Sequence, residues 1–209
     1  MQELLSGYQR FREQTLEPQR SRWHALGEGQ YPRTMVIGCC DSRVDPATIF
    51  DQPPGELFVV RNVANLVPPC EPDGTYHGTS SALEFAVTAL KIREIVVLGH
   101  ASCGGVEAAR KGAAPEGSFV GRWVGLLDEA RARLDEAGWP EDDAEAQLAL
   151  ELMGIRVSLD RLRTFPFVAS RLEAGNLALR GAHFGIADGA LRVMGEDGTF
   201  SLVNGAPER

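Results

Sequence analysis

The chain has 209 residues, of which 44% are hydrophobic and 24% are charged, and its formal net charge is −8. This composition is typical of a folded globular protein, and the length suits a single domain with its own core. The acidic balance argues against nucleic acid or an anionic membrane as the main partner, and no stretch approaches the ~18 uninterrupted apolar residues of a membrane-spanning helix.

The N-terminal sequence MQELLSGYQRFREQ has no basic segment followed by an apolar one, so we expect no secretory signal and a cytoplasmic location. The four cysteines are too few for a disulfide scaffold in a chain of this length. In a reducing compartment, cysteines beside a histidine indicate a metal site or catalysis. These cysteines are Cys39, Cys40, Cys70 and Cys103.

Residues 3–16 have the apolar spacing of a helix, which fades at Pro18, and RSRWHAL continues in the same way. We therefore expect an N-terminal helical arm over residues 1–28. Three short apolar runs rich in β-branched residues follow, and they predict central parallel strands. These runs are RTMVIGC (33–39), GELFVVRN (55–62) and REIVVLGH (93–100).

Between the last two strands, TSSALEFAVTALKI (79–92) predicts a helix with Thr79 or Ser80 as its N-cap, and strand–helix–strand order implies a parallel sheet. Further helices are expected over 119–136 and 141–164, and ALRVMGEDGTFSLV predicts two strands around a glycine-containing turn. The fold class is therefore α/β. We expect one domain over residues 1–209, with a central, mostly parallel β-sheet flanked by helices, the N-terminal arm, and a C-terminal extension of helix and strand.

Polar side chains follow each of the three predicted strands. Cys39–Arg43 follow the first, Arg61 and Asn62 end the second, and His100–Cys103 follow the third. In a parallel sheet these carboxyl ends meet at one edge. Thiolates and imidazole are the ligands of a soft, tetrahedral metal ion, and a set of three protein ligands leaves the open position of a catalytic site.

Cys39, His100 and Cys103 form such a set, provided that Cys40 is not a fourth ligand. Adjacent strand residues point to opposite faces, so Cys40 is predicted to be a small buried hydrophobic residue, and Cys70 to take no part. Taken singly, either cysteine is more often a core residue, and GHASCGG is similar to a phosphate loop but lacks its Lys-Ser/Thr end. A cysteine phosphatase would need a longer loop between its cysteine and arginine.

Taken together, C-x-D-S-R at 39–43 and G-H-x-x-C-G-G at 99–105 resemble the β-class carbonic anhydrases. The resemblance implies one Zn²⁺ per chain, held by Cys39, His100 and Cys103, and reversible hydration of CO2 to bicarbonate and a proton by zinc-bound hydroxide. It continues through GQYP (29–32), PGELFVVRNVAN (54–65), HGTSSALEFAV (77–87) and SLDRLRTFPFV (158–168).

Asp41 and Arg43 match the catalytic dyad of that family. The resemblance implies that Asp41, paired with the guanidinium of Arg43, orients the hydroxide, and that Asp41 becomes a fourth zinc ligand in a closed state at low pH. Without the resemblance, the same pair would be interpreted as a surface salt bridge.

The family's pocket residues match Gln30, Phe58, Val63, Phe85 and Gly104. In the family, the amide and the aromatic walls can come from a partner subunit. We therefore expect a homodimer or a dimer-based homo-oligomer, with the N-terminal arm packed on the partner. Taken singly, each Phe or Val is better explained as a core residue, and Gln30 could equally be a loop residue.

Phe85 stands where many relatives have Tyr, and Val36 where the bicarbonate-inhibited subgroup has Trp. The chain therefore resembles the non-allosteric, plant-like subgroup, and we expect a pH response without cooperative inhibition by bicarbonate. His77 is expected to be a loop or cap residue, for which proton shuttling is conceivable, and His183 has no assigned role.

Three alternatives stay open. The same scaffold and metal site would serve the hydrolysis of CS2 or COS. A zinc protein that binds bicarbonate without catalysis is the second alternative, and retention of both Asp41 and Arg43 argues against it. A purely structural zinc site is the third, and it requires a fourth protein ligand.

Overall fold

The structure, a computed structural model, describes residues 1–71, 77–115 and 117–203. The chain divides into two compact units, Met1–Tyr31 and Pro32–Arg209. The first unit contains α1 (Gln2–Phe11), a π-helical turn η1 (Arg12–Leu16) and α2 (Arg20–Glu28), as the helical spacing predicts. Within it, the rings of Phe11 and Trp23 meet edge to face with centroids 5.3 Å apart.

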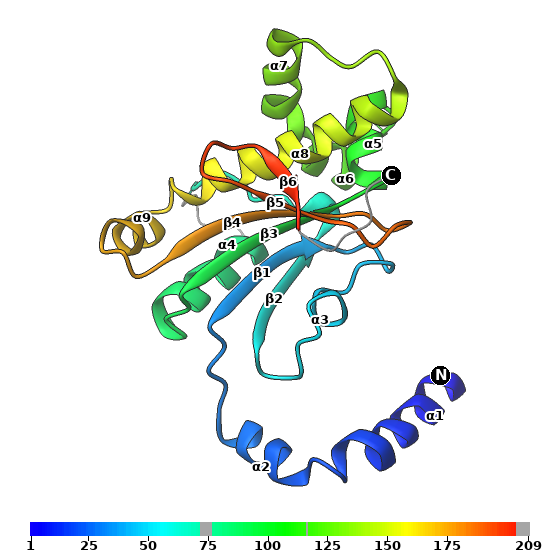
Figure 1. Ribbon diagram of the computed structural model, residues 1–209, viewed down its shortest axis with the longest axis vertical. Helices are drawn as coiled ribbons and strands as arrows, with labels where there is room; N and C mark the ends of the chain where they lie inside the picture. The colour runs from blue at the N-terminus through cyan, green and yellow to red at the C-terminus, as the bar shows by residue number, and fades with distance from the viewer. Residues whose placement is uncertain (72–76, 116, 204–209) are drawn as a thin grey trace. The chain divides into compact units, whose positions relative to one another are not determined.

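The second unit is built on a six-stranded sheet with the strand order β2-β1-β3-β4-β5-β6 (Figure 1). The first four strands in this order pair in parallel and the last two pair antiparallel, so the expected mostly parallel sheet is confirmed. The strands are β1 (Thr34–Cys39), β2 (Leu57–Asn62), β3 (Glu94–His100), β4 (Ala178–Phe184), β5 (Leu191–Met194) and β6 (Phe200–Leu202).

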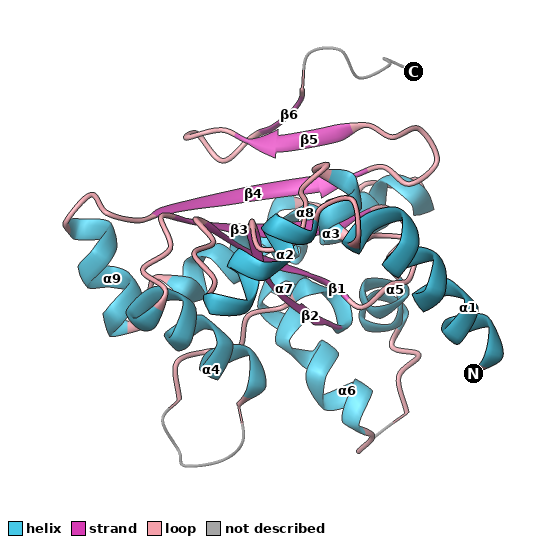
Figure 2. Cartoon of the chain, turned by 90° about the horizontal axis from the view of Figure 1, so that it is seen from below, coloured by secondary structure: helices cyan, strands magenta, loops and turns pink. Residues whose placement is uncertain are grey.

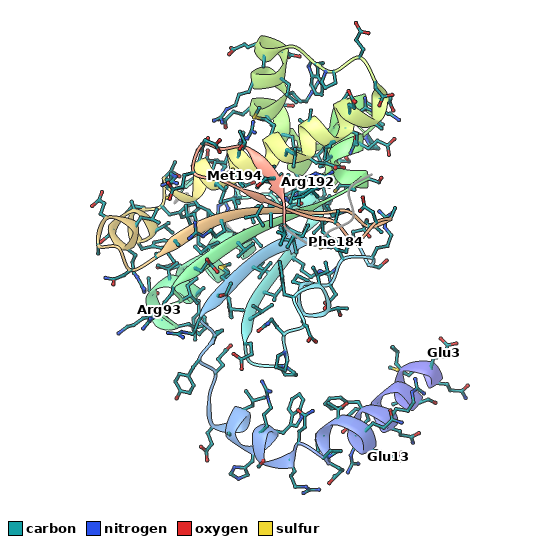
Figure 3. All side chains as sticks on the ribbon, viewed as in Figure 1. Glu3, Glu13, Arg93, Phe184, Arg192 and Met194 are labelled. Atoms are coloured by element: carbon teal, nitrogen blue, oxygen red, sulfur yellow. The ribbon has the colours of Figure 1, made fainter. Side chains whose placement is uncertain are left out.

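Strand β4 is the strand that sequence patterning misses, because Arg180 and Gly181 interrupt its apolar run. The predicted C-terminal pair of strands is confirmed as β5 and β6. Figure 2 shows both strands beyond β4 at one side of the sheet. Phe184 at the end of β4, and Arg192 and Met194 on β5, mark this antiparallel edge in Figure 3.

The predicted helices are also confirmed, although the segment 119–136 is divided by a 3₁₀ turn. No helix among the described residues is both long enough and apolar enough to cross a membrane. The helices and helical turns of this unit are α3 (Pro46–Ile49), η2 (Val63–Asn65), α4 (Gly78–Glu84), η3 (Phe85–Ala89), α5 (Gly104–Lys111), α6 (Phe119–Val124), η4 (Gly125–Leu127), α7 (Asp128–Ala137), α8 (Asp143–Leu162) and α9 (Pro166–Glu173).

The predicted N-cap of α4 was wrong. The helix begins at Gly78, so His77 is the N-cap residue and both Thr79 and Ser80 lie in the first turn. The hydroxyl of Thr79 is used instead as an acceptor for the side-chain amide of Asn62, at 3.2 Å. The expectation that His77 is a loop or cap residue is confirmed.

Both faces of the central strands are buried, which explains their uninterrupted apolar runs. On one face, Met35 and Ile37 of β1 and Ile95 and Val97 of β3 pack with residues of α4, α8 and α9. On the other face, a smaller cluster is formed by Val36, Leu98 and Ala182 together with residues near α3. The longest helix, α8, runs across β3 and β4 in Figure 1.

Two glycines allow α8 to approach the sheet closely. A Cβ atom at Gly99 of β3 would lie 2.8 Å from Cδ1 of Ile155, and one at Gly181 of β4 would lie 2.9 Å from Cγ2 of the same side chain. Ile155 therefore fills a hollow that only glycine leaves open, and it is fully buried there. This contact places the middle of α8 beside the carboxyl ends of the strands.

We expect Ile155→Ala to lower the free energy of unfolding by about 2–5 kcal/mol, because it leaves a cavity at this contact, and Ile155→Val by about 0.5–1.5 kcal/mol. Chemical denaturation followed by circular dichroism measures both values. A cost for Ile155→Ala no larger than that for Ile155→Val would show that α8 is not anchored here.

Candidate metal centre

Two neighbouring parallel strands and the turn after one of them supply the predicted ligands. Cys39 is the last residue of β1 and His100 the last residue of β3, so both lie at the carboxyl edge of the sheet. Cys103 is the N-cap residue of α5. The turn between His100 and Cys103 passes through Ser102, whose φ of 56° lies in the left-handed region that side chains other than glycine seldom adopt. This turn brings Cys103 back beside His100.

The three side chains form a compact, buried group. One candidate ligand atom from each residue lies within 4.8 Å of the others, and the two sulfur atoms are 3.9 Å apart. The carbonyl of Ala101 lies 3.0 Å from Nδ1 of His100; a carbonyl only accepts, so Nδ1 carries the proton. Nε2 of His100 is buried and has no hydrogen-bond partner among the described residues. Two thiols beside this free lone pair are the donor set of a soft metal ion.

The two thiols affect each other strongly. A hydrogen bond from Cys103 is the largest of the causes that lower the pKa of Cys39. The Cys39 thiolate in turn raises the pKa of Cys103 far above its usual value, and burial acts in the same direction. Metal ions bind cysteine as the thiolate, so a cation that binds both sulfur atoms would displace the proton that they share.

Asp41 and Arg43 form a bidentate ion pair next to this group. Nε and Nη2 of Arg43 donate to the two carboxylate oxygens at 2.9 and 2.6 Å, and the backbone N–H of Arg43 donates to the same carboxylate at 3.0 Å. These hydrogen bonds from Arg43 hold the pKa of Asp41 well below its usual value. Asp41 reaches within 3.9 Å of Nε2 of His100. In this structure it pairs with Arg43 and stays outside the group of three candidate ligands.

Arg61 fixes the backbone that carries this pair. Its guanidinium donates to the carbonyls of Cys39 and Asp41, both at 2.7 Å, and to that of Val44 at 3.0 Å. Sequence reasoning placed Arg61 at this edge but gave it no role there. The structure shows that it holds the loop after β1 in shape.

Sequence reasoning also missed Glu151. Its carboxylate, on α8, accepts the backbone N–H of Cys103 at 2.9 Å and lies 2.9 Å from Nε2 of His183. His183, which had no assigned role, is thus a fully buried residue of β4 paired with Glu151. The sequence does contain a signal for Glu151, because this charged residue interrupts an apolar helical face. That face is formed by Leu148, Leu152 and Ile155.

The predicted pocket residues fall into separate places. Val63 follows Asn62, which pairs with Cys39, and Gly104 follows Cys103, so both lie beside the ligands. Phe58 lies four residues before Asn62 on β2, or about 13 Å along the strand at ~3.3 Å per residue. Its ring packs against Phe85, with centroids 5.9 Å apart.

One chain therefore does not bring the Phe58–Phe85 pair to its own metal centre. Gln30 lies in the N-terminal unit, whose position relative to the sheet is not determined.

The prediction that Cys40 is buried was wrong, because its side chain is exposed. The residue follows the end of β1 and its N–H still pairs with the carbonyl of Asn62, but no described element covers it. It is not among the candidate ligands, as predicted. Cys70 is half-buried and packs against the main core.

Known proteins are similar to this chain in sequence and in fold. A family model described as carbonic anhydrase matches residues 34–191. Beta carbonic anhydrase 3 of Arabidopsis thaliana is 33% identical over 194 residues, which cover 90% of this chain and 74% of that protein. The chain belongs to the β-carbonic anhydrase family.

A second relative is mitochondrial beta carbonic anhydrase 6 of Arabidopsis thaliana, which is 36% identical; the match covers 91% of this chain but 66% of that protein's length. Among solved structures, the β-carbonic anhydrase CcaA matches with a TM-score of 0.90 and 33% identity, covering 100% of this chain and 92% of that one. A structure from a study of two tetrameric β-carbonic anhydrases of Sordaria macrospora matches with a TM-score of 0.80 and 25% identity, covering 99% and 98%.

We expect Arg43→Gln to raise the pKa of Asp41 towards the ordinary value of about 3.9, because hydrogen bonds from Arg43 are the main cause of its lowering. A lowered pKa means that the pair stabilises the fold above about pH 4 and that this contribution is lost as the pH falls further. Carboxyl ¹³C NMR titration from pH 7 down to about pH 2 compares the pKa of Asp41 in the two proteins.

Arg131→Gln is the control, since Arg131 pairs with Asp128 elsewhere on the chain. If Asp41 titrates identically in wild type and Arg43→Gln, the electrostatic role of the pair is refuted.

Proposed function

We propose that this protein is a zinc-dependent carbonic anhydrase that reversibly hydrates CO2 to bicarbonate and a proton. The observation that carries the proposal is the buried group Cys39–His100–Cys103 beside the Asp41–Arg43 pair. Membership of the β-carbonic anhydrase family supports it, because the matched relatives are named carbonic anhydrases.

The donor set fits Zn²⁺. Two cysteines and one histidine are common zinc ligands, and three protein ligands leave one position for substrate or water. When bound, Zn²⁺ lowers the pKa of a water ligand, to ~7 in carbonic anhydrases with three histidine ligands, and so supplies a nucleophile near neutral pH. Two thiolates neutralise more of the ion's charge than imidazoles do, so we expect this enzyme to favour higher pH.

Asp41 has the role of orienting the nucleophile. Because Arg43 donates to both of its oxygens, the carboxylate has a fixed direction, and its lowered pKa keeps it ionised in the working range. An ionised carboxylate only accepts hydrogen bonds, so it can accept one from an attacking O–H group and leave the oxygen lone pair free to meet the carbon of CO2. Closure of the site by Asp41 at low pH stays part of this proposal.

The substrate pocket is proposed to be completed by a second copy of the chain. Val63 and Gly104 lie beside the ligands, whereas Phe58 and Phe85 of the same chain lie at the other end of β2. Phe85 is 48% exposed and Val59, on the edge strand β2, is 38% exposed, as expected for residues that a partner covers.

A homodimer, or a larger assembly of dimers, is consistent with the tetrameric relatives in Sordaria macrospora. Gln30 and the N-terminal helical unit are proposed to contribute to that interface.

Val36 supports the proposed non-allosteric behaviour. It is buried in β1, where it packs with Leu98 and Ala182. An indole at this position, which the bicarbonate-inhibited subgroup has, is missing here, so we propose a pH response without cooperative shutdown. A cytoplasmic location stays a prediction.

Stopped-flow CO2 hydration by metal-quantified protein, from about pH 6.5 to 9, tests the proposed activity. We expect about one zinc per chain and a rate that rises with pH. Cys39→Ser and His100→Ala should lose both zinc and activity because each removes a ligand. Cys70→Ser, which removes a cysteine outside the candidate metal centre, should keep both. Zinc bound without hydration at any pH would refute the proposal and direct attention to CS2, COS and bicarbonate binding.

Asp41→Asn should keep its zinc but lower kcat/KM by about 10- to 100-fold, the usual range for a group that hydrogen-bonds within a metal site. The amide has the shape of the carboxylate, but it loses the charge that Arg43 orients. Asp128→Asn is the matched control, because it removes a carboxylate from an ion pair with Arg131 that is remote from the ligands. Full activity in zinc-loaded Asp41→Asn would refute the proposal that Asp41 orients the nucleophile.

A further inference from the structure

We propose that Glu151 and Gln147 of α8 are positioning residues for the ligand Cys103, and that they set the metal affinity of the site by fixing the orientation of its thiol. This inference rests on the proposed zinc centre and adds two residues to it. Neither side chain belongs to the group of candidate ligands.

The two side chains form hydrogen bonds with both the backbone N–H and the backbone carbonyl of Cys103. Oε1 of Glu151 accepts the N–H of Cys103 at 2.9 Å, and Nε2 of Gln147 donates to the carbonyl of Cys103 at 3.3 Å. The same amide of Gln147 donates to Oε1 of Glu151 at 2.8 Å. Gln147 and Glu151 lie one helical turn apart, so they face the same point. The backbone of this one ligand is therefore fixed on both sides by α8.

Other elements fix these two side chains in turn. Oε2 of Glu151 lies 2.9 Å from Nε2 of His183 on β4, and both residues are almost fully buried. Nε of Arg110, on α5, donates to Oε1 of Gln147 at 3.2 Å. The network thus joins α8, β4 and α5 around the turn that contains Cys103.

A structural role alone explains this network poorly. A buried carboxylate–histidine pair costs desolvation, and apolar residues of similar size are often as stable or more so. Glu151 lies on the apolar face of α8, where a leucine would pack against the surrounding cluster. The carboxylate becomes useful if its task is to fix the peptide of Cys103.

The backbone around Cys103 explains why its peptide needs to be fixed by other side chains. Ser102 has a φ of 56°, and the side chain of the N-cap residue Cys103 makes no capping hydrogen bond to α5. Without the acceptor on Glu151, the backbone of Cys103 loses one of the two hydrogen bonds from α8 that prevent its rotation. Rotation moves Sγ away from its place 3.9 Å from Sγ of Cys39. Residues that orient metal ligands typically change metal affinity or activity by about 10- to 100-fold when they are replaced.

The test compares zinc affinity, measured by chelator competition, with the thiolate-to-cobalt charge-transfer absorption of the Co²⁺-substituted protein. In Glu151→Leu we expect zinc affinity to fall by about 10- to 100-fold and the charge-transfer band to shift or weaken. Glu151→Gln keeps an oxygen acceptor for the N–H of Cys103, so it should retain most of the affinity and the wild-type band. Equal losses in Glu151→Leu and Glu151→Gln would overturn the geometric role.

Ser158→Ala is the matched control. Ser158 is a buried residue of α8 whose hydroxyl accepts the backbone N–H of Val67 at 3.3 Å, so this variant removes the same kind of bond away from the ligands. It should lower thermal stability and leave zinc affinity and the cobalt spectrum unchanged. A loss of affinity equal to that of Glu151→Leu would overturn the proposal, because general loosening of α8 would then suffice.

Gln147→Leu keeps the proposal testable if Glu151→Leu does not fold, because Gln147 is only half-buried. It should weaken zinc binding in the same direction but less, and wild-type affinity and spectrum in this variant would contradict the proposal. CO2 hydration is not part of the readout, so a wild-type protein that binds zinc without hydrating CO2 overturns the proposed function alone. A wild-type protein that binds no zinc overturns both, whereas unchanged affinity in folded Glu151→Leu overturns only this inference.

Discussion

Parallel pairing of β1 with β3 is the constraint on which the candidate site depends. The pairing places the ends of both strands at one sheet edge, so Cys39 and His100 meet although 61 positions separate their numbers in the chain. Cys103 joins them through a short turn. The ligand group is therefore a consequence of register. A shift of one residue would turn Cys39 to the opposite face of the sheet, away from His100.

Charged side chains surround the candidate metal ligands Cys39, His100 and Cys103. Arg61 holds the carbonyls of the loop after β1, Arg43 holds the carboxylate of Asp41, and Glu151 holds the N–H of Cys103. Each is joined to backbone or to an opposite charge, which lowers the cost of keeping it near a buried site. Backbone groups of both ligand-bearing segments are thereby fixed by side chains from other elements. This arrangement suits a site whose ligands must stay in place as substrate enters and leaves.

Local patterns predicted the parts of the fold that are made locally. The β-branched runs that became β1, β2 and β3 and the spacing that became α8 were sufficient to place those elements. β4 was missed because Arg180 and Gly181 break its pattern, and Gly181 is there to make room for Ile155, a contact between distant segments. The exposure of Cys40 could not be predicted, since strand alternation says which way a side chain points but not what covers it. His183 and Glu151 needed the packing of α8 on the sheet before either had a partner.

The candidate site also has one part that local sequence motifs could predict and another part that they could not. Two short motifs contain every residue of the ligand group and of the Asp41–Arg43 pair, so sequence reasoning could find them. The pocket is harder because its candidate walls, Phe58 and Phe85, lie at the far end of β2 from the ligands of their own chain. A family resemblance can name these residues, but it cannot show which copy of the chain they serve. If a partner supplies them, as we propose, one chain alone determines the geometry of the metal ligands, whereas two chains together form the substrate pocket. Changes at the interface would then alter kcat/KM while zinc affinity stays constant, whereas changes at Glu151 would alter zinc affinity within a single chain.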